Sequence, residues 1–331
     1  MMTRARFDVV GIGNAMVDVI AHAEESVLAS HHLVRGAMTL IDGERAESLY
    51  AAMPPAIEMS GGSAGNTVAG VASLGGRAAY VGKVSADQLG QVFAHDIRAS
   101  GVTFDVPASA DGAGTGRCLI FVTPDAQRTM QTFLGAGSEL QPDDVDADLI
   151  AAAKITYMEG YLWDPPGAKQ AFLKAARIAH EAGRKVSISL SDPFCVERHR
   201  REFVDLVEHH VDILFANEHE IMSLYQARTF DEALQRVRGK CDIAALTRSE
   251  KGAVIVAGDE LHVIDAEPVD EVVDTTGAGD LYAAGFLFGQ ARGMSVAMCG
   301  RIGGIAASEV ISHFGARPER SLAELVRERL G

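Results

Sequence analysis

The sequence has few cysteines and no long apolar run, and both shortages exclude classes of protein. The four cysteines among its 331 residues lie far apart, so no CxxC pair is available for a zinc ribbon or a redox site: Cys118, Cys195, Cys241 and Cys299. No run of about 18 or more apolar residues lacks a charged or polar break, which a membrane-spanning helix would need. The N-terminal residues contain no recognisable cleavable signal. We therefore expect a cytoplasmic protein with reduced thiols in its core and no membrane partner.

Positive charge is also scarce. The chain has 30 lysines and arginines against 45 aspartates and glutamates, which gives a formal net charge of −15. Such a field repels the phosphate backbone that a nucleic-acid binder has to neutralise, so we expect no nucleic-acid partner. The composition, 47% hydrophobic and 23% charged, is otherwise that of an ordinary globular protein, which excludes disorder for most of the chain.

Short apolar, β-branched runs alternate with longer amphipathic stretches along the chain. This alternation is typical of βα units and predicts an α/β fold with a central, mostly parallel sheet flanked by helices. The predicted strands are 7–12, 78–82, 154–159, 185–190, 212–216 and 242–246. The predicted helices are 88–99, 166–182, 196–209 and 278–291, with Gly183 ending the second of them.

Two regions, at about 16–41 and 102–134, interrupt the alternation and have the pattern of strands with one side facing solvent or a ligand. We expect them to form a small β-sheet that acts as a lid, because a sheet over a cleft can close and exclude water. No repeat or low-complexity linker divides the chain. Residues 1–331 are therefore expected to form one α/β domain that carries this lid.

The most specific motif is VDTTGAGD at 273–280, where Gly277, Ala278 and Gly279 precede an apolar helical pattern. Small residues at a helix start leave backbone N–H groups open to an anion. Asp280 falls in the first turn, where the helix dipole stabilises a carboxylate and keeps it able to accept a proton. An anion hole beside a base is what phosphoryl transfer to an alcohol requires. The alternative is a glycine-rich turn with an aspartate helix cap.

A second motif, at 60–76, places Gly61, Gly62 and Gly65 before another helix. The amide of Asn66 in this motif is suited to hydrogen bonds with a polyhydroxyl ligand. The alternative is again a capped helix without a binding role.

A third motif, FANEHE at 215–220, follows an apolar strand and puts Asn217 and Glu220 on one side of the next helix. An amide and a carboxylate in this position can hold the water shell of Mg²⁺, which keeps several of its waters when bound to proteins. Helix capping is the alternative role for this pair as well.

Other kinds of site are disfavoured. GIGNAM at 11–16 follows a strand, but Met16 stands where a dinucleotide-binding turn needs glycine or alanine, so a nicotinamide enzyme is disfavoured. The histidines form no HExxH pattern, and no metal site made of side-chain ligands is predicted. Adjacent histidines are assigned to the surface: His31, His32, His209 and His210. Four aromatic residues are left open between stacking on a nucleobase and packing in the core: Phe121, Phe133, Trp163 and Phe194.

The three motifs, GGSAGN, NEHE and DTTGAGD in that order, resemble those of the PfkB or ribokinase-like family of carbohydrate and nucleoside kinases. The resemblance spans nearly the whole chain. It implies a ribokinase-like fold and an ATP-dependent kinase with an alcohol group as acceptor. Three local stretches are most similar to the adenosine-phosphorylating branch of the family: 13–18, 189–194 and 211–220.

The resemblance also implies roles for single residues. Asp280 would take the proton from the primary hydroxyl of the acceptor, while the amides of 277–279 form the anion hole. Asp18 would bond the ribose 2′ and 3′ hydroxyls through charge-assisted hydrogen bonds. Arg128, on the lid, would reach the transferring phosphate, because its planar fork matches phosphate oxygens. The residues implied to lie near the acceptor sugar are Asn14, Asp18, Gly62 and Asn66.

On the ATP side, the resemblance implies contacts from Thr247 and Gly252 and a Mg²⁺ water shell held by Asn217 and Glu220. Members of the family often carry glycine where this chain has Ser249, which weakens the match of the ATP loop. ATP and Mg²⁺ are thus the implied cofactors. Several relatives also bind a monovalent cation through backbone oxygens, and the side chains here leave binding of K⁺ open.

Three functions follow from these patterns. The first is phosphorylation of adenosine to AMP at its 5′ hydroxyl, and the second is the same chemistry on another nucleoside or on a sugar such as ribose or fructose. The third is a non-catalytic protein that binds a nucleoside or sugar. A base at Asp280 favours a kinase, since a binding protein needs no base. The sequence does not distinguish a monomer from a homodimer formed by open lid edges.

Overall fold

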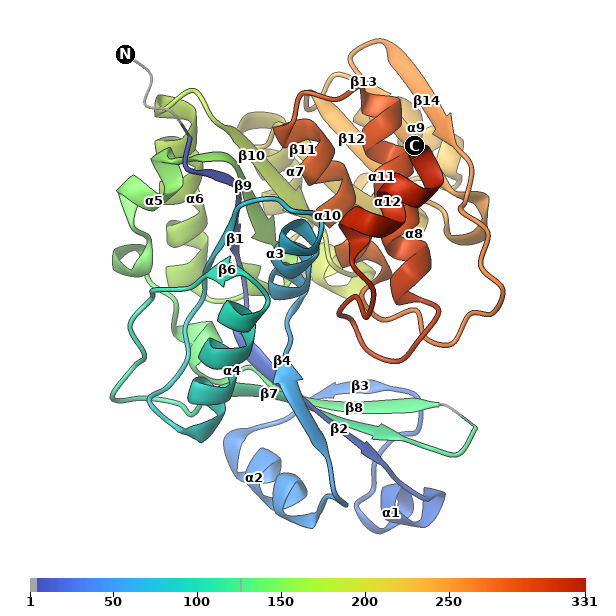
Figure 1. The fold of residues 1–331 in the computed structure, drawn as a ribbon. Coiled ribbons are helices and arrows are strands. Elements are labelled where there is room, and N and C mark those ends of the chain that lie inside the picture. Colours follow the sequence, from blue (N-terminus) through green and yellow to red (C-terminus); the bar gives the residue numbers. More distant parts are fainter. Residues whose placement is uncertain (1–4, 126) are drawn as a thin grey trace.

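The computed structural model describes residues 5–125 and 127–331, which form two β-sheets of different size (Figure 1). The strands are β1 (Phe7–Ile12), β2 (Met16–His22), β3 (Met38–Leu40), β4 (Ile57–Ser60), β5 (Ala78–Val81), β6 (Val102–Thr103), β7 (Gly116–Val122), β8 (Arg128–Phe133), β9 (Ala153–Glu159), β10 (Lys185–Ser189), β11 (Ile213–Asn217), β12 (Ile243–Thr247), β13 (Ala253–Ala257) and β14 (Glu260–Ile264). The helices are α1 (Glu25–Ser30), α2 (Gly43–Ala52), α3 (Ser63–Ser73), α4 (Gln88–Ala99), α5 (Ala147–Ala151), α6 (Pro166–Glu181), α7 (Pro193–His209), α8 (Glu218–Tyr225), α9 (Phe230–Val237), α10 (Ala278–Ala291), α11 (Val296–Val310) and α12 (Leu322–Leu330).

The large sheet has nine strands in the order β14-β13-β12-β11-β10-β9-β1-β5-β6. The strands from β12 to β6 are parallel, and β13 and β14 join antiparallel at one edge. Its central strands are buried along most of their length, which explains their nearly continuous apolar sequences. The predicted α/β fold with a mostly parallel sheet is confirmed. All six predicted strands are present, and their ends differ from the prediction by at most one residue.

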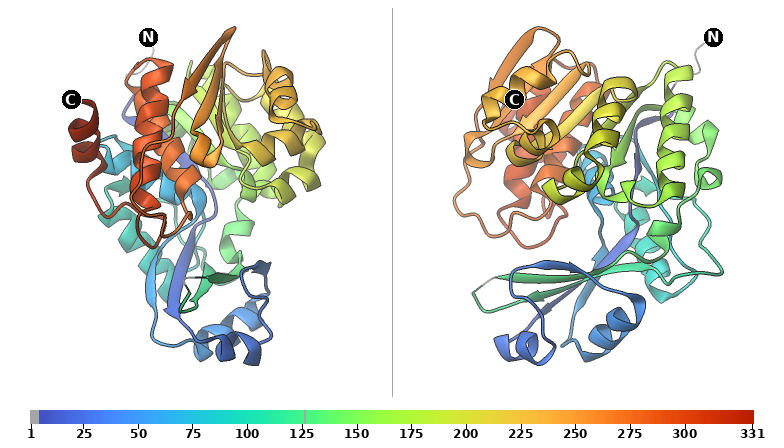
Figure 2. Two further views of the ribbon diagram at one scale, coloured as in Figure 1. Left: turned by 90° about the vertical axis from the view of Figure 1, so that its right-hand side faces the viewer. Right: turned by 180° about the vertical axis from the view of Figure 1, so that it is seen from behind.

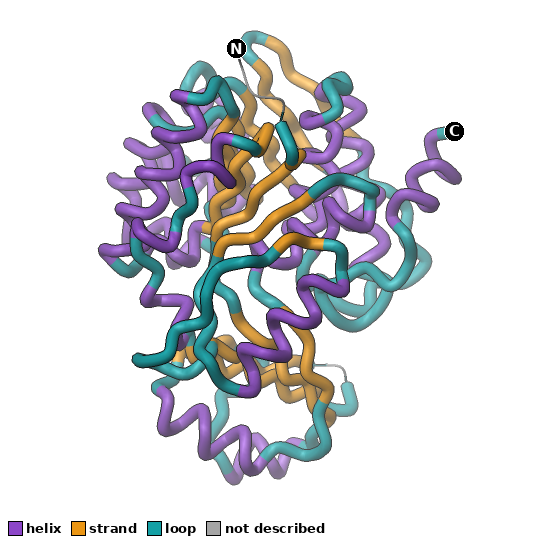
Figure 3. The backbone as a smooth tube through the Cα atoms, turned by 60° about the vertical axis from the view of Figure 1, so that its left-hand side comes forward, coloured by secondary structure: helices purple, strands orange, loops and turns teal. Residues whose placement is uncertain are grey.

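Helices cover both faces of this sheet (Figures 1 and 3). Neighbouring residues of β1 enter opposite cores, because successive side chains of a strand point to opposite faces. Val9 belongs to a cluster with residues of α3, α10 and α11, whereas Val10 belongs to a cluster with residues of α6 and α7. The sheet is therefore the shared wall of two hydrophobic cores.

The helix boundaries follow local capping. α6 ends at Glu181 and Gly183 follows with a φ of +67°, as the predicted stop requires. α7 begins three residues before its predicted start, because Asp192 accepts a hydrogen bond from the Cys195 N–H at 2.7 Å and proline suits the first turn. None of the helices in the described residues is both long enough and apolar enough to cross a membrane.

The small sheet has five strands in the order β3-β8-β7-β2-β4. We call residues 16–60 and 116–133, which hold this sheet with α1 and α2, the lid. Figure 2 shows the lid below the large sheet in two further views.

The predicted lid segments need two corrections. β4 pairs with β2 and belongs to the lid, although the predicted segment ended at residue 41. β6 lies inside the segment predicted for the lid, but it pairs with β5 in the large sheet. With four and two residues, these strands are too short to show a periodic pattern in the sequence.

Candidate active site

Polar side chains gather beside the first turns of α3 and α10, at the edge where the parallel strands end. This carboxyl edge is where α/β proteins place their ligands. Asp280, in the first turn of α10, accepts hydrogen bonds from two side chains of α3. Ser63 Oγ lies 2.6 Å from Oδ1, and Asn66 Nδ2 lies 2.9 Å from Oδ2. Two of the three sequence motifs therefore meet at the predicted base.

The environment of Asp280 sets its affinity for a proton. Burial raises the pKa of this carboxyl, while the hydrogen bonds from Ser63 and Asn66 and the positive charge of Arg317 hold the pKa down. The helix dipole, on which the prediction for Asp280 was based, lowers the pKa, whereas the burial of the carboxyl could not be seen in the sequence. A carboxylate with a raised pKa is a better proton acceptor than an ordinary aspartate.

The start of α10 fits an anion. Gly277 has a φ of +78°, and a Cβ there would lie 2.8 Å from Ala316, so glycine is required. Gly279 faces open space, since a Cβ there would meet no atom within 4 Å. Among the described residues, no group accepts a hydrogen bond from the N–H of Gly277 or Gly279, whereas the N–H of Ala278 donates to the Thr275 carbonyl at 3.2 Å. Two of the three predicted anion-hole amides are thus open, and the third is already bonded.

Asn14 follows β1 and binds a carboxylate that the sequence analysis missed. Asn14 Nδ2 donates to Glu159 Oε1 at 2.7 Å, and Glu159 Oε2 accepts the N–H of Ala64 at 2.8 Å. Burial raises the pKa of Glu159 to about 7. The only sequence signal for this residue is a charge at the end of an apolar strand.

Two buried amide oxygens of the candidate site lack a hydrogen-bond donor among the described residues. They are the Oδ1 atoms of Asn14 and Asn66. Buried polar atoms are nearly always satisfied, so the unpaired oxygen of Asn66, whose amide bonds Asp280, fits a ligand that carries donors such as hydroxyl groups. The unpaired oxygen of Asn14 lies near Gly137.

Asp18, in the lid strand β2, lies beside the turn that precedes α3. Its carboxylate lies against Gly61, where a Cβ would come within 2.4 Å of Oδ2. Gly62 has a φ of +83°, and a Cβ there would lie 2.2 Å from the Asn14 carbonyl oxygen. Burial raises the pKa of Asp18 to about 6, with Arg317 and Arg128 opposing the rise. The structure therefore brings Asn14, Asp18 and Gly62 together.

The lid face that carries Asp18 is mostly apolar, with His22, Arg128 and Thr132 as its other polar residues. In the ladder of β2 and β7, Asp18 pairs with Cys118 and Ile20 pairs with Ile120. Ile120 pairs in turn with Met130 of β8. Because paired residues share a face of a sheet, these side chains lie together, and they form an apolar cluster separate from both cores.

The same face continues onto β3. Met38 pairs with Met130 and Leu40 pairs with Thr132. Met38 and Leu40 are 46% and 53% exposed, although both are apolar. The lid thus presents an apolar surface, part of it open to solvent, on the side where Asp18 meets the candidate site.

Arg128, at the start of β8, connects the lid to the loop before α10. It forms an ion pair with Asp274 and donates to Thr276 Oγ1 at 3.0 Å. Asp274 also accepts hydrogen bonds from the N–H groups of Thr276 and Gly315, each at 3.0 Å. The guanidinium predicted to bind phosphate is therefore paired with a carboxylate here, and a phosphate would have to compete with Asp274 for it.

Asn217 and Glu220 form a reciprocal capping box at the start of α8. Asn217 Oδ1 accepts the N–H of Glu220 at 2.9 Å, and Glu220 Oε2 accepts the N–H of Asn217 at 2.9 Å. Asn217 Nδ2 also donates to Glu220 Oε1 at 2.6 Å. Burial raises the pKa of Glu220 to about 7. The helix-cap alternative is therefore present in the structure, and the role of this pair toward Mg²⁺ stays a prediction.

The residues predicted for the ATP side lie after the neighbouring strand. Thr247 ends β12 and pairs in register with Asn217. Gly252 has a φ of +78°, and a Cβ there would lie 2.0 Å from the Ile264 carbonyl oxygen. Ser249, which replaces the usual glycine, has a φ of +52°, in the region that favours glycine. This turn therefore keeps a glycine-like conformation with a serine in it.

The four aromatic residues that were left open between base stacking and core packing differ in burial. Trp163 packs in one of the cores and donates its Nε1–H to Glu202 at 2.7 Å, and Phe121 is buried in the other core. Phe133 is half-buried on the lid. Phe194, in the first turn of α7, is 72% exposed. Of the adjacent histidines, His32 and His209 are exposed and His31 and His210 are partly exposed.

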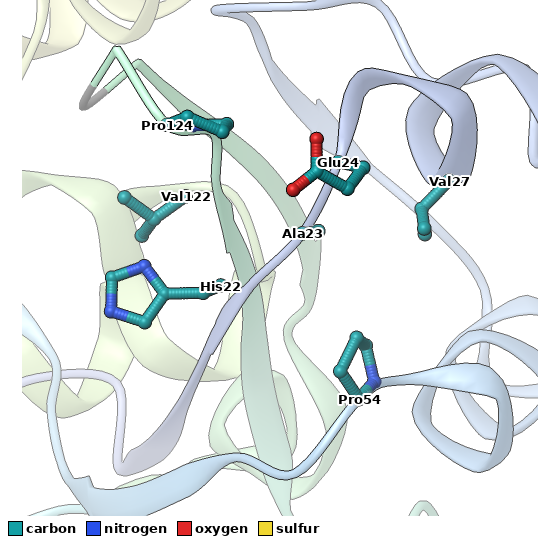
Figure 4. A pocket seen from close by; sticks show the side chains of 7 residues that line it. All are labelled: His22, Ala23, Glu24, Val27, Pro54, Val122 and Pro124. Atoms are coloured by element: carbon teal, nitrogen blue, oxygen red, sulfur yellow. The ribbon is translucent and has the colours of Figure 1, made fainter.

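Two cavities occur in the lid. One of about 230 Å³ lies at the free end of the lid, where His22, Glu24 and Pro54 line it (Figure 4). The other, of about 270 Å³, lies beside Tyr50 and Glu58. Neither is lined by a predicted site residue, so the candidate site is defined by its converging side chains.

Comparison with known proteins agrees with this geometry. The family model for pfkB carbohydrate kinases matches residues 56–321. This chain belongs to the PfkB family. The protein is therefore a phosphotransferase with an alcohol group as acceptor, and its fold is ribokinase-like.

Individual PfkB-family relatives carry two kinds of name. The crystal structure of adenosine kinase from Sinorhizobium meliloti is 54% identical and covers 98% of this chain and 99% of its own, with a TM-score of 0.91. That of a probable sugar kinase from Rhizobium etli CFN 42 is also 54% identical, covers 98% of each chain and has a TM-score of 0.91. Adenosine kinase of Saccharomyces cerevisiae is 27% identical over 311 residues, which are 85% of this chain and 88% of the yeast protein.

Proposed function

We propose that this PfkB-family kinase phosphorylates the 5′ hydroxyl of adenosine with ATP and releases AMP. The observation that favours a nucleoside as the acceptor is the apolar lid face around Asp18. This face is formed by Met16, Ile20, Ile120 and Met130. With the ribose hydroxyls bonded to Asp18, a purine base would cover the partly exposed residues of this surface, Met16, Ile20 and Met130, and remove them from water. A free sugar would leave these three side chains partly exposed. The similarity to two proteins named adenosine kinase supports the same acceptor.

The residues at the start of α10 would carry the chemistry. Asp280 accepts the proton of the acceptor hydroxyl, while Ser63 and Asn66 fix the orientation of its carboxylate. The open amides of Gly277 and Gly279 stabilise negative charge on the group being transferred. The lid excludes water, which would otherwise compete with the alcohol for the phosphoryl group.

The open amides and the free space at Gly279 fit a bound phosphate. ATP supplies the phosphoryl group, and Mg²⁺ neutralises part of its charge. We assign nucleotide contacts to Thr247 and Gly252 and the waters around Mg²⁺ to Asn217 and Glu220. Arg128 binds phosphate oxygens after exchanging its partner Asp274 for them.

A sugar kinase is the second candidate. It is supported by the solved relative named probable sugar kinase, which is as similar to this chain as the one named adenosine kinase. The same base and anion hole would serve a sugar hydroxyl. The two functions therefore differ only in whether the acceptor carries a base that covers the lid face.

Release of ADP from Mg-ATP tests the proposal, measured with adenosine, other nucleosides, ribose and fructose. We expect turnover with adenosine and none with the free sugars. Asp280→Asn serves as the matched inactive control. Turnover with a sugar alone would replace the first candidate by the second. No ADP release with any acceptor would contradict both and favour a binding protein.

Asp18→Ala is expected to raise the KM for the nucleoside by at least about 10- to 150-fold, because the loss of even one charge-assisted hydrogen bond costs about 1.5 to 3 kcal/mol. The bonds form in the ground state and the transition state alike, so kcat should change less than KM. Steady-state kinetics with the nucleoside and ATP varied separately measures this, with the KM for ATP as the internal control. A lower kcat at unchanged nucleoside affinity would show that Asp18 is misassigned.

A further inference from the structure

Arg317 lies in the segment between α11 and α12 and binds the turn that joins the lid to α3. Its Nε donates to the Ser60 carbonyl oxygen at 3.2 Å, Nη2 donates to Ser60 Oγ at 2.9 Å, and Nη1 donates to the Gly65 carbonyl oxygen at 2.9 Å. These acceptors are neutral. Within the described part of the chain Arg317 takes part in no ion pair, although its guanidinium is largely removed from solvent.

A guanidinium withdrawn from water without a carboxylate bonded to it is costly unless nearby negative charge compensates it. The turn that Arg317 binds, residues 60–66, carries both donors to Asp280, namely Ser63 and Asn66. The two donors of Ser60 already have another partner, since Asp96 accepts from its N–H at 2.7 Å and from its Oγ at 2.6 Å. The carboxylates whose negative charge acts on Arg317 are Asp96 of α4 and then Asp18 and Asp280, so two of the three belong to the candidate site.

We propose that Arg317 is a positioning residue of this kinase: its planar fork fixes the 60–66 turn and places its positive charge on the turn that contacts both Asp18 and Asp280. The proposal rests on the function proposed above, because it takes Asp280 as the base. Burial raises the pKa of both carboxyls, and in both cases the charge of Arg317 opposes the rise.

The other charges around the two carboxyls do not replace this one. The titratable groups that interact with Asp280 come from the lid, from β9 and the turn after it, from α8 and from the C-terminal segment: Asp18, Tyr157, Glu159, Tyr161, Glu220 and Arg317. Arg317 is the one cation in that set. Asp18 additionally faces Arg128 and Cys118. Arg128 is bonded to Asp274, so much of its charge is already compensated.

The pH profile of kcat/KM tests the proposal. A base with a higher pKa loses its proton at higher pH, so Arg317→Gln is expected to move the acid limb of the profile upward by about one pH unit, the low end of the effect of a neighbouring opposite charge. Arg317→Lys keeps the charge and loses the fork, so its acid limb should stay in place while the KM for the acceptor rises several-fold. An acid limb of Arg317→Gln that coincides with the wild type would overturn the electrostatic role.

Arg329→Gln is the matched control. Arg329, in α12, also bonds across the C-terminal region, to Glu267 at 3.3 Å and Ser308 at 3.0 Å, but none of the site residues is its partner. Its pH profile should coincide with the wild type even if its melting temperature falls. If Arg317→Gln does not fold, Ser60→Ala removes one acceptor and leaves the charge, and an acceptor KM unchanged from wild type would then overturn the positioning role.

The inference can fail separately from the proposed function. A ¹³C NMR titration of the aspartate carboxyls, assigned with Asp18→Asn and Asp280→Asn, reports both pKa values in the wild type and Arg317→Gln without any turnover. Absence of ADP release would end the proposed function, whereas unchanged carboxyl pKa values in Arg317→Gln would end the inference. Raised values would support the inference for either acceptor.

Discussion

Asp280→Asn is expected to lower kcat by about 10²- to 10⁴-fold, which corresponds to about 3 to 5 kcal/mol of lost transition-state stabilisation. The amide has nearly the shape of the carboxylate but cannot take the proton of the acceptor hydroxyl. Both hydrogen bonds of the wild type can persist. The new Oδ1 can accept from Asn66 Nδ2, while the new NH₂ group donates to Ser63 Oγ, because a hydroxyl can accept as well as donate.

Because these contacts persist, nucleoside binding should change little in Asp280→Asn. Isothermal titration with the nucleoside and single-turnover kinetics with Mg-ATP separate binding from the chemical step. Equal losses in binding and in rate would contradict the assignment of Asp280 as the base. A second control is Ser63→Ala, which removes one bond to the carboxylate but keeps the base, and which should retain far more activity than the asparagine variant.

Gly277→Ala is expected to lower kcat by about 10²- to 10³-fold, the effect of losing an oxyanion-type donor. Its φ of +78° disfavours any residue with a Cβ, and that Cβ would lie 2.8 Å from both Cα and Cβ of Ala316. The start of α10 would have to shift, and its open amides would no longer face the transferring group. Nucleoside affinity should be largely kept, since Asp18 and Asn14 do not depend on this turn.

Gly279→Ala is the control for stability in this experiment. A Cβ at Gly279 would meet no atom within 4 Å, so the melting temperature of Gly279→Ala should match the wild type. That of Gly277→Ala should fall by about 1 to 2 °C for each kcal/mol that an alanine in this conformation costs. If Gly277→Ala kept wild-type kcat, the amides at the start of α10 would not be the anion hole.

The sequence predicted the large sheet well, for a physical reason. Parallel strands covered on both faces are nearly continuous apolar runs, so strands such as β1 and β9 stand out from their surroundings. The lid is half-exposed and its pattern is weaker, which explains why β4 was missed and β6 was assigned to the wrong sheet. The sequence pattern of Asn217 and Glu220 predicted two alternative roles, helix capping and binding of Mg²⁺ waters. The capping box is present in the structure.

The residues that sequence reasoning missed act over long distances along the chain. Glu159 binds Asn14, 145 positions away, and Arg317 binds Ser60, 257 positions away. Apart from the place of Glu159 at the end of an apolar strand, nothing local distinguishes these two side chains from ordinary surface charges, because their partners are set by the packing of whole elements. Asn66 also has a distant partner that the sequence did not predict. It was predicted to meet the sugar, and the structure adds a hydrogen bond from its amide to Asp280.

The described chain passes between the large sheet and the lid four times, at residues 13–15, 61–62, 104–115 and 134. Asn14 and Gly62 stand on two of these crossings, so two of the four residues assigned to the acceptor also lie where the lid is attached. We therefore expect acceptor binding and lid position to be linked equilibria. A substitution or a co-solvent that favours one lid position by a given factor would change the apparent affinity for the acceptor by up to that factor, without altering a single contact to it.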